Sequence, residues 1–180
     1  ARETPEGMGM LDELPGAEPP APIVTRRLEL RPFTPDELEA VASGTSLPHF
    51  ARGFPSAQNQ DWARDALAAG EHFFTESRCA QRAVVERSSG QVIGAAGFTG
   101  PAMDHELEVE GSLVPQHRGQ GLATEGLRAL LEEAFEDPDV RAVQASVPTG
   151  EHPAHHVLAR CGFQPLPSDG SEDSYRLPRP

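Results

Sequence analysis

The chain has 180 residues, enough for one domain with a substantial core and too few for two domains of ordinary size. Its formal net charge of -13 would repel a phosphate backbone and attract a cationic amine, so we expect no nucleic acid partner. No stretch approaches the ~20 apolar residues that span a bilayer and no signal-peptide pattern is visible, so we expect no membrane partner. The cysteines Cys79 and Cys161 are too few for a disulfide scaffold and indicate reduced thiols in a cytoplasmic protein.

The beginning of the chain differs in composition from the rest. Residues 1–22 are rich in Gly, Pro and acidic side chains without periodicity, which predicts a disordered leader followed by a single folded domain over 23–180. A strand is predicted over 27–31, where apolar and charged residues alternate. The capping-box pattern Thr34–Glu37 then predicts a short helix over 35–42.

A second helix and a hairpin follow in the middle of the chain. Ser56 is a suitable N-cap for a helix that ends at Gly70. Strands are predicted over 82–87 and 92–98, and the turn signal at 88–91 joins them into a predicted β-hairpin. This order of elements indicates that the first half of the chain builds antiparallel sheet.

The second half alternates strands with helices. A strand over 106–114 precedes a strong helix over 122–135, and a strand over 141–147 precedes a short helix over 155–160 and final strands near 163–177. One face of the longer helix is predicted to be apolar and to consist of Ala123, Leu127, Leu130, Leu131 and Ala134. The strand–helix–strand unit predicts one parallel strand pair, and the whole pattern predicts an α/β fold with a mostly antiparallel sheet.

The segment from Val114 to Ala123 carries the clearest functional pattern. A strand runs into a turn that holds Gly119 and Gly121, and a helix opens directly afterwards. The first N–H groups of a helix have no partner inside it, and the helix dipole adds positive charge there, so such a turn can bind an anion. Glycines allow the backbone to approach a phosphate closely, and Arg118 can add a charge-assisted contact.

Two nucleotide-binding motifs do not fit this turn. Thr124 stands where the dinucleotide fingerprint needs its third glycine. No Gly-Lys-Ser/Thr sequence follows, which excludes a nucleotide P-loop. A tight strand-to-helix connection without a ligand is the structural alternative.

The sequence around the turn resembles a known family. Gln116-x-x-Gly119-x-Gly121 is similar to the Q/R-x-x-G-x-G/A signature of the GNAT acetyltransferase superfamily. The flanking residues resemble its ribosomal-protein N-terminal acetyltransferase (RimJ/RimL-like) branch. Further resemblance lies in Thr25–Arg31, Val92–Phe98 and Val157–Phe163, so that it covers roughly 23–177.

This resemblance implies a fold, a donor and a set of contacts. The implied fold is a mixed, mostly antiparallel sheet with a splayed parallel strand pair and about four flanking helices. The implied donor is acetyl-CoA, with no metal, and an amine acceptor attacks it directly. A backbone N–H on the strand would polarise the thioester carbonyl. The residues implied in cofactor binding are Ser112, Leu113, Val114, Arg118, Gly119, Gln120, Gly121, Leu122, Ala123 and Thr124.

The chain departs from the pattern of this branch in two places. Glu151 and Ala154 stand where the branch usually has Asn and Ser, which help to hold CoA. The strand before the signature reads Glu108-Val109-Glu110-Gly111 where the branch usually reads Glu-x-Gly-Tyr. These departures keep open a second hypothesis, a CoA-binding sensor or interaction module without catalytic activity.

Transfer to an amine requires a group that accepts a proton. Glu108 and Glu110 lie two residues apart on the predicted strand and therefore share a face. If that face lines the cleft, their repulsion raises one pKa toward a useful value for a base. Both are candidate catalytic residues, with Glu108 first because it occupies the family's Glu position. A solvated strand face is the alternative.

Other polar and aromatic residues give weaker signals. His152, His155 and His156 cluster without the further ligands of a zinc site and are expected on a helix surface. The loop residues His49–Phe50 are candidates for shaping an acceptor pocket, and Tyr175 is a weaker candidate for a general acid.

The predicted function is acetyl transfer from acetyl-CoA to a primary amine, either a protein N-terminus or a small molecule. The sequence does not identify the acceptor. It also leaves the oligomeric state open, with a homodimer as one candidate.

Overall fold

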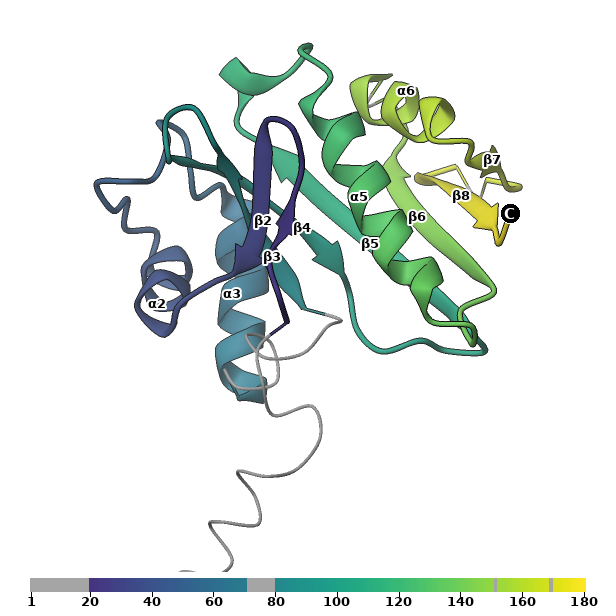
Figure 1. Ribbon diagram of the computed structural model, residues 1–180, viewed down its shortest axis with the longest axis horizontal. Coiled ribbons are helices and arrows are strands. Elements are labelled where there is room, and N and C mark those ends of the chain that lie inside the picture. The colour runs from purple at the N-terminus through teal and green to yellow at the C-terminus, as the bar shows by residue number, and fades with distance from the viewer. Residues whose placement is uncertain (1–19, 71–79, 151, 169) are drawn as a thin grey trace, which may run out of the picture.

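The computed structural model describes residues 20–70, 80–150, 152–168 and 170–180 (Figure 1). Most of the predicted leader, Cys79 and Glu151 lie outside the described residues. In chain order the elements are β1 (Ile23–Val24), β2 (Leu28–Pro32), α2 (Pro35–Ser43), α3 (Ala57–Ala69), β3 (Gln81–Glu86), β4 (Val92–Phe98), β5 (Glu106–Leu113), the 3-10 helix η1 (Pro115–His117), α5 (Leu122–Glu136), β6 (Ala142–Pro148), α6 (His152–Arg160), β7 (Gln164–Pro165) and β8 (Glu172–Pro178).

All eight strands form one open sheet in the order β1-β2-β3-β4-β5-β6-β8-β7. Every neighbouring pair is antiparallel except β5 and β6, which run parallel because α5 carries the chain back between them. The predicted α/β class, the mostly antiparallel sheet and the single parallel pair are therefore confirmed.

The first two helices begin where their caps predict. The Thr34 side chain accepts a hydrogen bond from Glu37 N–H (3.1 Å) and the Glu37 carboxylate accepts one from Thr34 N–H (2.9 Å). Ser56 caps α3 in the same reciprocal way with Asn59. These local bonds satisfy amide groups that a helix start leaves without partners, so short segments suffice to set the two boundaries.

The helix α5 packs its apolar side against the sheet. Its buried side chains include Leu122, Leu130, Leu131 and Ala134. Arg82 of β3 is 1% exposed and forms an ion pair with Glu133 of α5 at 2.7 Å. Ala123 was predicted on this face, but it is exposed, although Leu122 and Thr124 in the same first turn are buried, because nothing covers the helix at this one position.

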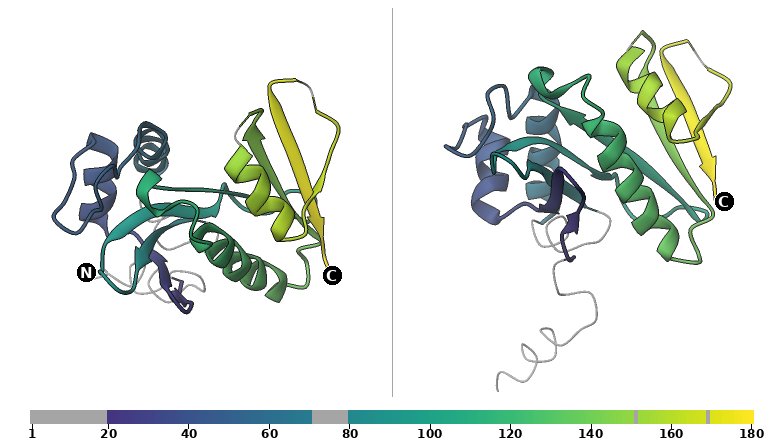
Figure 2. Two further views of the ribbon diagram at one scale, coloured as in Figure 1. Left: turned by 90° about the horizontal axis from the view of Figure 1, so that it is seen from above. Right: turned by 45° about the horizontal axis from the view of Figure 1, so that its top comes forward.

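The helices cover both faces of the sheet. In Figure 2, α2 and α3 lie on one face, near the end that holds β2 to β4, and α5 lies on the opposite face. The core between these layers includes Leu28, Leu30, Leu38, Ile93 and Val143, each fully buried. Helix α6 begins at His152, three residues before the predicted start, and packs beside α5. Among the described residues, no helix combines the length and apolarity that crossing a membrane requires.

Candidate active site

The turn before α5 has the backbone shape that its glycines predict. Gly119 and Gly121 have φ values of 77° and 80°, in the left-handed region that glycine adopts without steric strain. The helix begins directly afterwards, with Gly121 as a cap that offers no side chain. We call residues 118–121 the glycine turn.

The glycine turn leaves amide groups free at the helix start. The first bond of α5 runs from Glu125 N–H to the Gly121 carbonyl (3.0 Å). Within the described part of the chain, the N–H groups of Leu122, Ala123 and Thr124 therefore have no acceptor. With the partial positive charge of the helix start, they form a site suited to an anion.

A neighbouring loop holds the glycine turn in place. Arg27, between β1 and β2, donates through Nη1 to the Gln120 carbonyl (2.9 Å) and through Nε to Glu125 (2.8 Å). Thr25 donates to the same Glu125 carboxylate at 2.6 Å. These bonds join the glycine turn and the first turn of α5 to the β1–β2 loop, so the free amides keep a fixed direction.

A hollow of about 540 Å³ lies beside the glycine turn, along α5. Its walls include Arg27, Gly121 and Thr124, and the side chains Arg128 and Arg160 add further positive charge. Arg128 donates to the Arg160 carbonyl at 3.3 Å, which joins α5 to the end of α6. Glu125 and Glu132 also line the hollow, so its three arginines outnumber its carboxylates by one.

The strands β5 and β6 separate on the side of the glycine turn. They are paired only from Glu106 with Ala142 to Glu108 with Gln144, and beyond these residues they diverge (Figure 1). We call this opening the splay. The predicted splayed parallel pair is thus present.

The direction of the backbone decides which amides of β5 face the splay. Successive residues of a strand point their N–H and C=O groups to opposite edges. Val114 N–H donates to the Ile93 carbonyl (2.9 Å), and the Glu108 carbonyl accepts from Thr99 N–H (2.9 Å), so even-numbered residues face β4. Leu113 and Gly111 therefore face the splay. The amide of Val114, predicted to contact the cofactor, is already bonded within the sheet.

Arg118 points back to this edge of β5. Its Nε donates to the Leu113 carbonyl at 3.0 Å, so the guanidinium lies at the splay beside the glycine turn. The signature residue Gln116 donates to the Arg52 carbonyl (2.7 Å), and Gln120 donates to the Gln116 carbonyl (3.1 Å). The side chains of Gln116 and Gln120 thus stabilise the loops around the glycine turn.

The two candidate carboxylates share a face of β5, as predicted, but their surroundings differ. Glu108 is exposed, whereas Glu110 is half-buried below α3. Burial raises the pKa of the Glu110 carboxyl above its ordinary value of 4.5, and the nearby Glu108 carboxylate raises that pKa further. The repulsion expected from the sequence is present, but burial is the larger cause.

A narrow hollow surrounds Glu110, and we call it the Glu110 hollow. The residues around it come from α3 and from three neighbouring strands: Asn59, Trp62, Gln81, Ala95, Glu110 and Ser112. Neither Gln81 nor Trp62 was predicted as a site residue, because each belongs to a segment with no motif. Only the pairing of β3, β4 and β5 brings Gln81 near Glu110.

The loop residues predicted as candidates for an acceptor pocket have other roles. Phe50 is 4% exposed and packs against Phe54 in the core. His49 contacts Glu37 of α2 through Nε2 at 2.6 Å. Neither residue lines the Glu110 hollow. Their contacts instead stabilise the layer of α2 and α3 on one face of the sheet.

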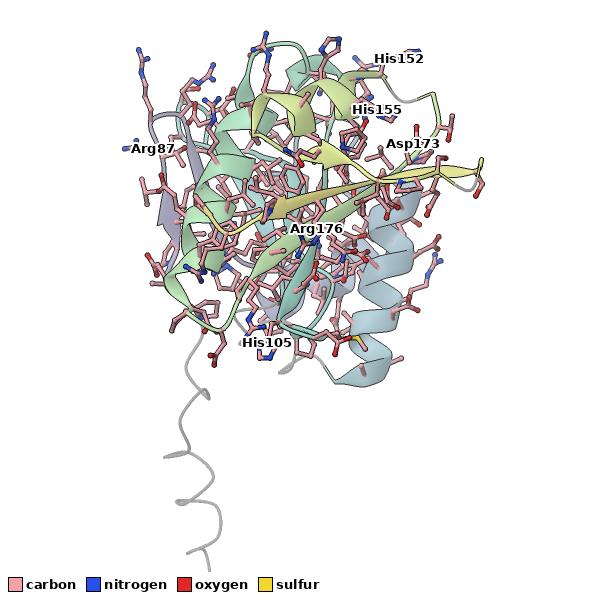
Figure 3. All side chains as sticks on the ribbon, turned by 90° about the vertical axis from the view of Figure 1, so that its right-hand side faces the viewer. Arg87, His105, His152, His155, Asp173 and Arg176 are labelled. Carbon is pink, nitrogen blue, oxygen red and sulfur yellow. The ribbon has the colours of Figure 1, made fainter. Side chains whose placement is uncertain are left out.

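The histidines of α6 do not act as a group. His155 bonds through Nδ1 to the Tyr175 hydroxyl and lies 3.6 Å from Asp173 through Nε2. Figure 3 shows His152, His155 and Asp173 where α6 meets β8. Among the described residues, no cluster of three potential ligands could hold a metal ion. The proposed role of Tyr175 as a general acid stays a prediction.

Comparison with known proteins gives a consistent result. A family model described as Acetyltransferase (GNAT) domain matches residues 27–164. An N-acetyltransferase of Bacillus subtilis, YoaA, itself uncharacterized, is 25% identical over 144 residues, which are 78% of this chain and 81% of that protein.

Solved structures share the fold over nearly the whole chain. An acetyltransferase from Agrobacterium tumefaciens has a TM-score of 0.66 at 24% identity and covers 89% of this chain and 95% of its own. RimL, a ribosomal alpha-N-protein acetyltransferase in complex with coenzyme A, has a TM-score of 0.65 at 15% identity and covers 88% of this chain and 98% of its own.

Proposed function

The chain belongs to the GNAT acetyltransferase family, and we propose that it transfers the acetyl group of acetyl-CoA to a primary amine by direct attack. The observation that carries this proposal is the position of β5. Its end leads into the glycine turn, one edge faces the splay, and one face presents Glu110. A donor at the turn and an acceptor at Glu110 would meet at this single strand.

The residues around the glycine turn fit the diphosphate of acetyl-CoA. The free N–H groups of residues 122–124 would hold it, and Arg118 would add a charge-assisted contact. Arg128 and Arg160 would lie along the remaining phosphate of the nucleotide in the adjoining hollow. The shared fold with RimL, which was solved with coenzyme A, supports this assignment.

The edge of β5 is suited to the acyl end of the donor. Acetyl-CoA would supply a thioester whose carbonyl carbon forms a C–N bond with the amine while the C–S bond breaks and the thiol leaves. The amides of Gly111 and Leu113 face the splay and would donate to the pantetheine arm and the thioester oxygen. Amides fixed in a sheet need no reorganisation when charge develops on that oxygen.

Glu110 is our candidate for the group that accepts the amine proton. Its raised pKa makes it a stronger base than an ordinary carboxylate, and it lies in the hollow, whereas Glu108 is exposed. Glu108 would act on Glu110 through its charge. The acceptor would be a protein N-terminus or a small amine in the cytoplasm, and the oligomeric state, a homodimer included, stays a prediction.

The test compares two matched substitutions, Glu110→Gln and Glu108→Gln, with acetyl-CoA and a panel of amines. Release of the thiol reports turnover, and calorimetry reports CoA binding. Glu110→Gln should lower kcat/KM by roughly 10²–10⁴, the usual loss for one general base, with CoA affinity unchanged. In the wild type, kcat/KM should rise with pH through an acidic limb above pH 4.5, because Glu110 must be ionised.

Glu108→Gln serves as the control because it removes only the neighbouring charge. It should shift the acidic limb to lower pH and lower the maximal rate far less. A wild-type rate and an unchanged acidic limb in Glu110→Gln would contradict the role of Glu110. CoA binding without thiol release for any amine would favour the alternative, a non-catalytic CoA-binding module.

A further inference from the structure

A row of residues crosses three strands beneath α3. Gln81 of β3 pairs with Gly97 of β4, and Gly97 pairs with Glu110 of β5. Residues in one row share a face of the sheet, and neighbouring strands lie about 4.8 Å apart, so Gln81 and Glu110 stand roughly 10 Å apart at their Cα atoms. The backbone of Ala80 and Gln81 passes close over Gly97, so the Glu110 hollow is narrow, with a volume of about 10 Å³. It has a polar side chain at each of two ends, Gln81 and Glu110.

The polar end at Gln81 offers an unused donor. The Gln81 side chain is buried, with 4% of its surface exposed, and its Nε2 has no hydrogen-bond partner among the described residues. A buried N–H group without an acceptor is unfavourable, so such a group usually donates to a bound water, ion or ligand. This one lines the hollow that also contains the carboxylate of Glu110.

The roof of the Glu110 hollow is held rigidly. Asn59 lines the hollow, and its Oδ1 accepts a bond from Ser56 N–H (3.0 Å) in the cap of α3. Trp62, one turn later, packs against Phe33 with ring centroids 5.6 Å apart. A fixed aromatic wall next to a carboxylate is suited to the aliphatic part and the amino group of a small cation.

We propose that the Glu110 hollow selects an acceptor by two groups at once: Glu110 takes the amine, and Gln81 Nε2 donates to a neutral oxygen carried close to that amine. The inference rests on the proposed function, since it assumes that this hollow receives the acceptor. An amide carbonyl fits the second group better than a carboxylate, because Glu108, Glu110 and the net charge of -13 repel an anion.

The test uses Gln81→Met, which keeps the length of the side chain and removes the donor, with Gln91→Met in the β3–β4 turn as matched control. Gln81→Asn, which stays polar but withdraws the donor by one methylene, is the second variant if the first does not fold. The acceptors are alaninamide and propylamine, which has no oxygen. Comparing each acceptor between variants cancels the difference in amine pKa.

Two measurements separate this inference from the proposed function. In Gln81→Met, kcat/KM for alaninamide should fall about tenfold while that for propylamine and that of the control variant stay unchanged. Calorimetry in the presence of CoA should show the same loss of alaninamide affinity. Equal losses for both acceptors, or no loss in either measurement, would overturn the role of Gln81. A Gln81-dependent affinity in a protein that acetylates no amine would support this inference and refute the proposed function instead.

Discussion

The charge cluster at Glu37 gives a quantitative test of how the α2 layer is stabilised. The Glu37 carboxylate is 5% exposed and accepts bonds from Arg31 Nη1 (2.8 Å), Arg31 Nη2 (2.9 Å), His49 Nε2 (2.6 Å) and Thr34 N–H (2.9 Å). Burial opposes ionisation of this group, but the bonds from Arg31, Thr34 and His49 outweigh it and lower the pKa of Glu37 from 4.5 to about 2.

The pKa shift of Glu37 determines how much its ionised carboxylate stabilises the fold and over which pH range. A drop from 4.5 to about 2, at about 1.4 kcal/mol for each pKa unit, corresponds to roughly 3 kcal/mol of stability at neutral pH. Because the folded pKa is depressed, this contribution is fully present above pH 4.5 and is lost as the pH falls from there toward 2. Glu37→Gln should therefore lower the free energy of unfolding by roughly 3 kcal/mol at pH 7.

Urea unfolding of the wild type and Glu37→Gln at pH 7, 5 and 3 measures the effect. The difference in unfolding free energy should be nearly equal at pH 7 and 5 and clearly smaller at pH 3. Asp36→Asn, next to Glu37 in the same helical turn but exposed, is the matched control and should change stability little. A loss below 1 kcal/mol at pH 7, or one that is the same at pH 3, would refute the assignment of this stability to the ionised carboxylate.

Two further predictions concern the glycine turn. Gly121→Ala should weaken CoA binding, measured by calorimetry, more than it lowers the stability of the fold. The control Gly90→Ala, at a similar φ of 73° in the β3–β4 turn, should bring the same backbone strain and leave CoA affinity unchanged. Equal CoA affinity in both variants would show that the glycine turn is only structural. Arg27→Gln should raise the Kd for CoA about 5-fold by releasing the turn. Arg87→Gln loses bonds to the Thr25 and Arg26 carbonyls but none to the glycine turn itself, so it should raise the Kd for CoA less than Arg27→Gln does. Equal effects of the two substitutions would contradict a specific role for Arg27.

The sequence determined the features that depend on neighbours along the chain. The caps at Thr34 and Ser56 fixed two helix starts, because a cap joins residues only three apart. The positive φ values of Gly119 and Gly121 follow from residue type at a strand-to-helix turn. Two carboxylates on one face of β5 follow from the period of a strand.

The sequence prediction was wrong where the outcome depended on what covers a surface. Helical spacing placed Ala123 with the buried residues of α5, but periodicity does not show which positions of a helix other elements cover, and Ala123 is exposed. In the first turn of α5, Leu122 and Thr124 are buried while Ala123 between them is exposed, and the N–H groups of all three have no acceptor among the described residues.

The tertiary structure alone decided the chemistry around Glu110. The row of Gln81, Gly97 and Glu110 depends on the register of three strands, and Trp62 reaches the hollow only because α3 packs over that row. Neither register nor helix packing is encoded in a short stretch of residues, since both follow from burial of the whole core. The sequence could indicate that one of two carboxylates has a raised pKa; burial beneath α3 determined that it is Glu110.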